Sequence, residues 1–232
     1  MPKERMIEKE VGSYISTLLR DYFGKGPSSV YVTANPPYIT IQLRGFLAPT
    51  EKFLLRQKEI RRILETRDLL MKDLKEQIAG ELSGIGEFSV GDMYTDWNLE
   101  EQTGLILAVL ENGMDGSESG WPKPIDDAGF RETISRFSEK AQKIPEKVEA
   151  FWLNNRTLLV KRSGIFIHIE KELIEAGFDD ELKLVKRPME RRMLMEINWR
   201  PVIGRSVQEV YMDWNILEDY GYIILILDPE EK

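Results

Sequence analysis

The sequence has no cysteine and only one histidine, and these absences remove several classes of site. Disulfides, thiolate nucleophiles and thiolate metal ligands are all excluded, and the composition suits a reducing compartment. No run approaches the roughly 18 apolar residues that a membrane-spanning helix needs. The start, Met1-Pro-Lys-Glu-Arg, lacks the apolar segment of a secretory signal. We therefore expect a cytoplasmic protein that is not itself membrane-spanning.

Basic residues are also in the minority. The 232 residues include 32 Lys and Arg against 40 Asp and Glu, which gives a net charge of −8. A protein whose main partner is a phosphate backbone needs the opposite balance, so nucleic acid is not expected as a partner. The apolar fraction of 42% is enough to bury the core of one large domain or of two domains of ordinary size.

What the chain does contain is a repeat. The pattern Y-x-D-W-N-x-x-E-x-x-G occurs at 94–104 and again at 211–221, 117 residues later. Three further matches fall at an offset of 119: Asn35 with Asn154, Gly45 with Gly164, and Glu51-Lys52 with Glu170-Lys171. Matches at a nearly constant offset indicate a tandem duplication. We predict a first repeat over 1–111, a linker rich in Gly, Ser and Pro over 112–127, and a second, diverged repeat over 128–232.

Both repeats show the same order of local patterns. Apolar residues at three- and four-residue steps predict an opening helix, over 4–23 in the first repeat. Runs rich in β-formers predict hairpins over 29–44 and 88–110, and over 148–162 and 207–227. Between the hairpins, Pro49 begins one long charged helix that extends to Leu82, whereas Gly177 and Pro188 divide the second repeat's helix into two or three pieces. The fold class is therefore α+β: two tandem helix-hairpin-helix-hairpin repeats, each a mainly antiparallel four-stranded sheet with helices on one face.

The repeated motif supplies the candidate ligand or metal site. Asp96 with Glu100, and Asp213 with Glu218, carry the oxygen ligands that Mg²⁺ or Ca²⁺ prefers. The alternative is a hairpin bend, in which Asp and Asn hydrogen-bond their own backbone while the motif tryptophan faces the core. Two carboxylates do not specify a metal, so no cofactor and no catalytic residue is predicted.

Three other features have structural explanations. Gly24-Lys-Gly-Pro27 lacks the spacing of a phosphate-binding loop and is explained as a helix stop. His168 has no nucleophile beside it in the sequence, and we expect it to serve in packing or capping. A group of basic residues is interpreted as a solvated helix face in preference to a surface for an acidic partner or an anionic membrane; its members are Lys183, Lys186, Arg187, Arg191, Arg192, Arg200 and Arg205.

The first repeat resembles a known family. Gly24-Lys-Gly-Pro27, the stretch Leu43-Arg-Gly-Phe-Leu-Ala-Pro-Thr-Glu-Lys52, a charged helix and a closing hairpin resemble the MpsC-type domain over about residues 4 to 111. Ala48 stands where the family pattern has Thr, and Thr50 where it has Ala. The second repeat looks like a diverged copy that keeps Gly164 and the Glu-Lys pair but loses the G-K-G-P turn and the proline.

The resemblance implies a function without a catalytic residue. It points to a non-enzymatic accessory or interaction protein associated with a sodium-dependent membrane-potential-generating, inorganic-carbon-uptake system, with a membrane transport component as protein partner. The alternatives are a small-molecule or metal-dependent enzyme that uses the four motif acids, and a ligand-sensing module with a site at the repeat interface. Homo-oligomers are compatible with each of these hypotheses.

Overall fold

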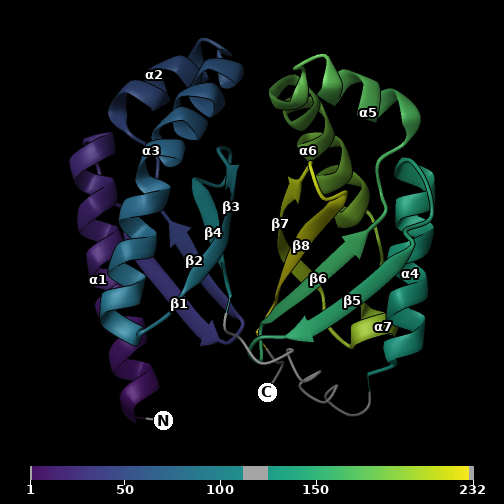
Figure 1. The fold of residues 1–232 in the computed structure, drawn as a ribbon, viewed down its shortest axis with the longest axis horizontal. Coiled ribbons are helices and arrows are strands. Elements are labelled where there is room, and N and C mark those ends of the chain that lie inside the picture. Colours follow the sequence, from purple (N-terminus) through teal and green to yellow (C-terminus); the bar gives the residue numbers. More distant parts are fainter. Residues whose placement is uncertain (1, 112–124, 230–232) are drawn as a thin grey trace. The chain divides into compact units, whose positions relative to one another are not determined.

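The computed structural model describes residues 2–111 and 125–229, and the chain divides into two compact units, Met1–Gly116 (unit 1) and Ser117–Lys232 (unit 2). Figure 1 shows both units, and each is described by itself. Residues 112–124, which make up most of the predicted linker, lie outside the described residues, as do Met1 and residues 230–232.

Unit 1 is a four-stranded antiparallel sheet with three helices. Its elements are α1 (Pro2–Phe23), β1 (Ser29–Asn35), β2 (Tyr38–Arg44), α2 (Pro49–Arg56), α3 (Ile60–Gly86), β3 (Val90–Asn98) and β4 (Thr103–Leu110). The two hairpins meet through β2 and β4, which gives the strand order β1-β2-β4-β3.

Unit 2 repeats this arrangement. Its elements are α4 (Asp127–Ala141), β5 (Lys147–Trp152), β6 (Thr157–Ser163), α5 (His168–Glu175), α6 (Asp179–Met195), α7 (Arg200–Ile203), β7 (Val207–Asn215) and β8 (Tyr220–Leu227). The strand order is β5-β6-β8-β7, again antiparallel throughout. The predicted α+β fold with two similar halves is confirmed.

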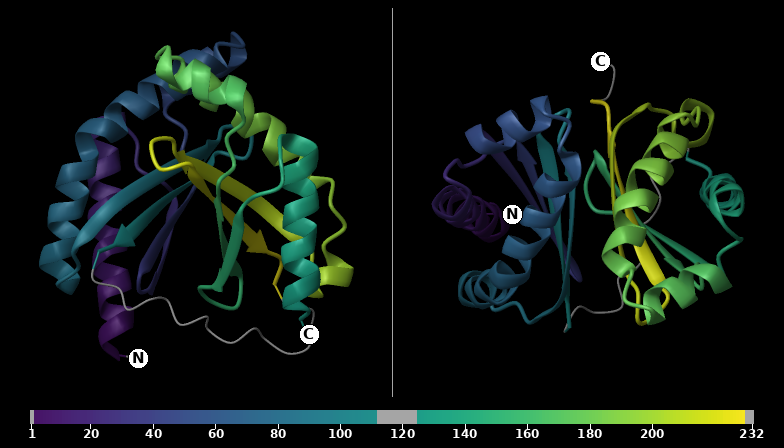
Figure 2. Two further views of the ribbon diagram at one scale, coloured as in Figure 1. Left: turned by 45° about the vertical axis from the view of Figure 1, so that its right-hand side comes forward. Right: turned by 90° about the horizontal axis from the view of Figure 1, so that it is seen from above.

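Each core lies between one face of the sheet and the helices. Along β2 the alternate residues Ile39, Ile41 and Leu43 are fully buried and pack against the α1 stripe that contains Ile15 and Leu19. Figure 2 shows that the helices of each unit gather on the same side of its sheet. The Trp of the repeated motif belongs to this core in both units, as the alternation predicts.

Two predictions about the helices need correction. The single long helix expected from Pro49 is broken into α2 and α3, because Lys58 adopts a left-handed conformation with φ of 62°. Gly177 does the same at the equivalent place in unit 2, with φ of 81°. Pro188, in contrast, lies inside α6 and does not end it. An interior proline costs a helix roughly 3 kcal/mol. Arg187 and Glu190, in the same turn of α6, are held in buried ion pairs.

Candidate functional site

The two motif bends are built by turn hydrogen bonds. In unit 1 the Asp96 carboxylate accepts a hydrogen bond from the Trp97 amide at 2.7 Å, and the Asn98 side-chain oxygen accepts one from the Glu101 amide at 3.2 Å. Glu100 is exposed. This is the backbone bonding that Asp and Asn offer at the end of a strand.

Unit 2 reproduces the bend residue by residue. Asp213 accepts from the Trp214 amide at 2.9 Å, and Asn215 accepts from the amide of Glu218 at 3.1 Å. Glu218 is exposed, as are Glu101, its equivalent at the offset of 117, and the predicted Glu100. In both units the carboxylate on the strand is buried and the one at the bend faces solvent, so the two predicted partners lie in different environments.

The glycine that ends the motif has a steric role. Trp97 pairs across the hairpin with Gly104, and Trp214 pairs with Gly221. A Cβ at either glycine would overlap the indole ring opposite it. The glycine therefore leaves the space that the buried tryptophan ring occupies, and it is a strand residue.

Cations already surround one of the candidate metal ligands. The Asp213 carboxylate lies 2.9 Å from Arg187 Nη2 and 3.3 Å from Lys183 Nζ. A nearby positive charge opposes the binding of a second cation. Within residues 2–111 and 125–229, no group of three or more Asp, Glu or His side chains is placed to hold a metal ion. The metal hypothesis for these acids stays a prediction.

A buried ion pair that the sequence did not reveal joins three elements of unit 1. Glu51, in the first turn of α2, accepts hydrogen bonds from Arg67 Nε and Nη2 of α3, both at 2.7 Å. The Glu51 carboxylate also accepts from the Ala48 amide at 2.7 Å and so caps α2. The Arg67 guanidinium lies 4.7 Å from the ring centres of both Phe46 and Trp97. The Glu51–Arg67 ion pair, the N-terminal cap of α2 and the motif tryptophan Trp97 thus form one connected cluster.

The same cluster is present in unit 2 with lysine in place of arginine. Glu170 Oε1 lies 2.7 Å from Lys186 Nζ, and Glu170 Oε2 accepts from the Ile167 amide at 3.0 Å. Lys186 Nζ lies 5.6 Å from the ring centre of Trp214. Glu51 and Glu170, like Arg67 and Lys186, are 119 residues apart, so the pair is shared by the two units.

Unit 2 extends this pair into a buried ionic network. Arg162 Nη2 donates to Glu190 Oε2 at 2.7 Å and Nη1 donates to Ser138 Oγ at 3.0 Å. Both side chains of the ion pair are completely buried, and Lys186 Nζ lies 3.2 Å from the other Glu190 oxygen. Two cations and two carboxylates therefore alternate in the order Glu170, Lys186, Glu190, Arg162.

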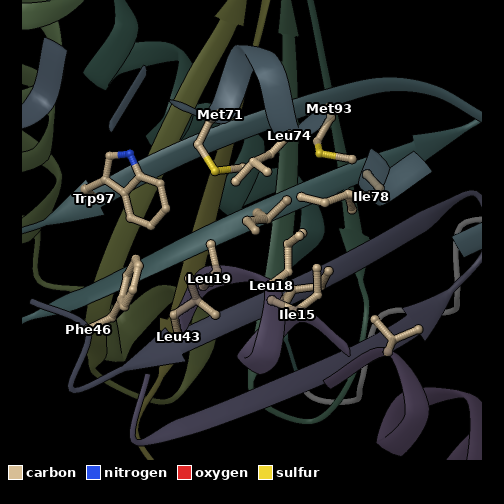
Figure 3. Close-up of a cluster of buried hydrophobic side chains, with 14 of the residues drawn as sticks. Ile15, Leu18, Leu19, Leu43, Phe46, Met71, Leu74, Ile78, Met93 and Trp97 are labelled. Carbon is tan, nitrogen blue, oxygen red and sulfur yellow. The ribbon is translucent and has the colours of Figure 1, made fainter. Parts of the chain in front are cut away.

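Unit 1 has apolar residues at the corresponding places. At the offset of 119, the residues of unit 1 that are equivalent to Ser138, Arg162 and Glu190 are Leu19, Leu43 and Met71. These three belong to the hydrophobic core of unit 1, and Figure 3 shows them in one cluster with Phe46 and Trp97. Burying an ion pair costs desolvation free energy that an apolar trio does not, so the network does not represent the more stable solution.

The interpretation of the basic cluster as a solvated helix face is wrong for two of its members. Lys186 and Arg187 are buried, and both are engaged by carboxylates of the same unit. Sequence reasoning missed this because a cation at a buried helix position looks the same in the sequence as one on the surface. The signal available was the spacing: Lys186 falls where Arg67 falls, 16 residues after an equivalent glutamate.

These polar groups do not form a nucleophilic site. The Ser138 hydroxyl is buried and accepts a hydrogen bond from Arg162, a cation that cannot act as a base. His168, the single histidine, is exposed at the first residue of α5, where unit 1 has Pro49. The arrangement can hold helices and strands together, and it offers no hydroxyl–imidazole pair for acyl transfer.

Asp219, next to the predicted Glu218, is a second acid, besides Asp213, that connects the second motif to the rest of unit 2. Its carboxylate accepts from the amides of Ile165 and Phe166 at 2.7 and 2.8 Å and lies 2.8 Å from Lys171 Nζ. Partial burial alone would raise the pKa of Asp219, but these hydrogen bonds and the lysine charge outweigh it and hold the pKa below its usual value.

A pocket of about 380 Å³ opens between α4 and α6 of unit 2. Its lining combines apolar side chains with two cations and one carboxylate: Phe137, Met193, Ile197, Arg136, Lys140 and Glu196. In unit 1 the position equivalent to the pocket residue Thr133 is Tyr14, whose hydroxyl donates to the Gln77 carbonyl oxygen at 3.4 Å. At this one lining position, unit 1 has the larger side chain, Tyr14 in place of Thr133.

Comparison with known proteins identifies unit 1. Residues 3–112 match the family described as Na+-translocating membrane potential-generating system (MpsC). The first unit is an MpsC domain. No curated protein and no solved structure matches the chain. No helix in the parts of the chain that the structure describes is long and apolar enough to cross a membrane.

The geometry explains what the MpsC motifs do in this chain. Gly24, in the G-K-G-P turn, has φ of 70° and follows the last residue of α1, which confirms the helix stop. In the stretch that precedes α2, Ala48 has no side-chain oxygen, so Glu51 alone caps the helix. The glutamate of the MpsC motif is thus the residue that Arg67 binds, and its function in this domain is to fix α2 against α3.

Proposed function

We propose that this chain is a non-enzymatic accessory protein of a sodium-dependent membrane-potential-generating system, and that it acts at the cytoplasmic face through contact with a membrane component. The observation that carries the proposal is the match of residues 3–112 to the MpsC family, whose description names such a system. The cysteine-free composition supports a reducing compartment.

The use of the polar residues also supports a binding role over catalysis. Four deeply buried charged groups, Arg67, Arg162, Lys186 and Glu190, have carboxylate or cation partners inside their own unit. Catalytic groups need instead to face a substrate. We infer that the exposed surfaces, and not a buried site, carry the function.

The test is co-purification of the tagged full-length chain from the membrane fraction of its native cell, combined with a deletion of its gene. We expect recovery of a membrane subunit of the system and loss of the sodium-dependent component of the membrane potential, measured with a potential-sensitive dye. The matched control is Glu100→Gln/Glu218→Gln, which removes the two exposed candidate metal ligands and should behave as wild type. Recovery of no membrane subunit, with an unchanged potential in the deletion strain, refutes the proposal.

A second candidate function is the sensing of a small ligand in the pocket of unit 2. Its apolar wall and its excess of cations, Arg136 and Lys140 against Glu196, suit a small organic carboxylate, and its volume is at the lower end of that of ligand sites. Thermal unfolding with a panel of aromatic and aliphatic monocarboxylates tests it. A stabilising member should lose its effect in Thr133→Tyr, which places in the pocket the side chain that unit 1 has there.

A further inference from the structure

The turn between α2 and α3 in unit 1 carries a strong excess of positive charge. Residues 52–62, here called the basic corner, contain five basic residues and one acidic residue, a net charge of +4. Phe53 and Ile60 lie among them with 54% and 44% of their surface exposed. Lys52, Arg56 and Lys58 are exposed as well. The corner is therefore an exposed apolar pair surrounded by cations.

The equivalent turn of unit 2 has the opposite charge. Residues 171–181, the acidic corner, lie at the offset of 119 and contain one basic residue and five acidic residues, a net charge of −4. Leu173 and Phe178 are 36% and 49% exposed there. Glu172 and Glu175 are exposed beside them. The same turn of the repeated fold thus exposes apolar side chains in both units, and these are surrounded by positive charge in unit 1 and by negative charge in unit 2.

Helix stability explains only part of these charges: Arg56 in the last turn of α2 and the acids Asp179, Asp180 and Glu181 in the first turn of α6 lie where the dipole favours them. The positive end of a helix dipole favours acids in the first turn and the negative end favours bases in the last turn. Arg61 and Arg62 instead stand in the first turn of α3, which has no acid, and Glu175 is the last residue of α5, whose last turn has no base. Glu59 and Glu65 compensate the two arginines only through exposed pairs. A partner outside the unit would account for Arg61, Arg62 and Glu175, which the dipoles of their own helices do not favour.

We propose that the basic corner of one chain docks on the acidic corner of a second copy of this chain. Phe53 and Ile60 of one corner would meet Leu173 and Phe178 of the other, and the charges would form a complementary rim. An apolar centre with a complementary polar rim is the usual anatomy of a protein interface, and the opposed charges suppress pairing of like corners. Because each chain carries both corners, the contact joins unlike surfaces, as in head-to-tail association.

Charge reversal with mixing provides the test. The first variant, Lys52→Glu/Arg56→Glu, removes the positive excess of unit 1, and the second, Glu172→Lys/Glu175→Lys, removes the negative excess of unit 2. All four side chains are exposed, so the folded state should persist, which circular dichroism checks. The matched control is Arg5→Glu/Lys9→Glu on α1, where two exposed residues change the net charge by the same amount as in the first variant.

Sedimentation equilibrium of the full-length proteins across a concentration series gives the readout. For wild type and the control we expect a species at least twice the mass of the 27.0 kDa chain. That species should dissociate between about 0.01 and 1 M salt, because the Debye length falls from about 30 to about 3 Å over this range. Each corner variant alone should associate at least about tenfold more weakly, since a corner without net charge then faces a charged one and the electrostatic complementarity is lost.

Mixing the two variants distinguishes attraction between two chains from attraction between the two corners of one chain. In an equimolar mixture, the unchanged acidic corner of the first variant can meet the unchanged basic corner of the second variant on a different molecule, so a complex with one wild-type contact should form. Wild type that remains a single chain at every concentration and salt overturns the proposal. So does a mixture that fails to associate, because attraction between the corners of one chain would not be restored by a second chain.

Discussion

Arg67 and Lys186 occupy the same place in the two units, and each binds the glutamate that caps the short helix before it. The arginine makes two hydrogen bonds to Glu51, whereas the lysine divides its charge between Glu170 and Glu190. Unit 2 has the compact ammonium group of Lys186 where unit 1 has the guanidinium of Arg67, and it also has a second buried carboxylate, Glu190, beside that lysine. One fold thus uses two different arrangements of buried charge.

Replacing Arg67 with methionine should destabilise unit 1 by about 3–5 kcal/mol, because Glu51 would remain buried without its cation. Arg67→Lys should cost less, since unit 2 holds its glutamate with lysine. Hydrogen exchange followed by mass spectrometry of the full chain measures the two units separately. Equal losses of protection in the two variants would show that the charge of Arg67 contributes little.

The buried network of unit 2 can be converted into the apolar cluster of unit 1. The triple variant Ser138→Leu/Arg162→Leu/Glu190→Met should be neutral or more stable by about 1–4 kcal/mol, whereas Arg162→Leu alone should lose about 3–5 kcal/mol. The difference arises because the single change leaves Glu190 buried beside Lys186 only. Urea unfolding of the three proteins is the measurement. A triple variant less stable than the single one would show that the network is required for the fold.

Gly104 and Gly221 should not tolerate alanine. A Cβ at either position overlaps the ring of the paired tryptophan, and such overpacking costs about 1–3 kcal/mol. Gly80 is the matched control, because nothing lies within 4 Å of a Cβ there and the residue is inside α3. Gly80→Ala should stabilise the chain by roughly 0.5–1 kcal/mol. Thermal unfolding and tryptophan fluorescence report both effects; an unshifted Trp97 signal in Gly104→Ala would contradict the steric explanation.

Asp219 should make unit 2 sensitive to acid. Its pKa is lower in the folded state than in the unfolded chain, so its stabilising contribution is complete above the unfolded pKa of about 3.9 and is lost as the pH falls through the folded pKa. Asp219→Asn keeps an oxygen acceptor but not the charge. Its unfolding free energy should therefore fall less between pH 7 and pH 3 than that of wild type. Parallel pH profiles for the two proteins would show that the charge is not involved.

The motif acids offer a direct test of metal binding. Calorimetric titration of the full chain with Mg²⁺, Mn²⁺ and Ca²⁺, beside Asp96→Asn/Asp213→Asn, distinguishes the hypotheses. The ion pairs of Asp213 with Arg187 and Lys183 lead us to expect no heat in either protein. Heat that appears in wild type and disappears in the double variant would establish the metal site in place of the turn interpretation.

Much of the architecture could be predicted, because it follows from short-range patterns. The alternation of Ile39, Ile41 and Leu43 predicts a half-buried strand, and the offset of 119 predicts a second unit of the same design. The Asp-Trp-Asn bend was equally predictable, because its hydrogen bonds join neighbours in the chain. The break at Lys58 was not, because a lysine in the left-handed region carries no distinctive sequence signal.

The sequence by itself determined which segments become helices and strands and that the motif tryptophan lies inside. Only the tertiary structure decided which charged side chains are buried and paired. Arg67 binds Glu51, 16 residues away in the sequence, and Arg162 binds Glu190, 28 residues away. A buried cation is stable only when folding brings a carboxylate within hydrogen-bonding distance, and that distance depends on how α3 and α6 lie over their sheets. The physical reason is that burial and ion pairing depend on long-range contacts, which periodicity along the chain does not encode.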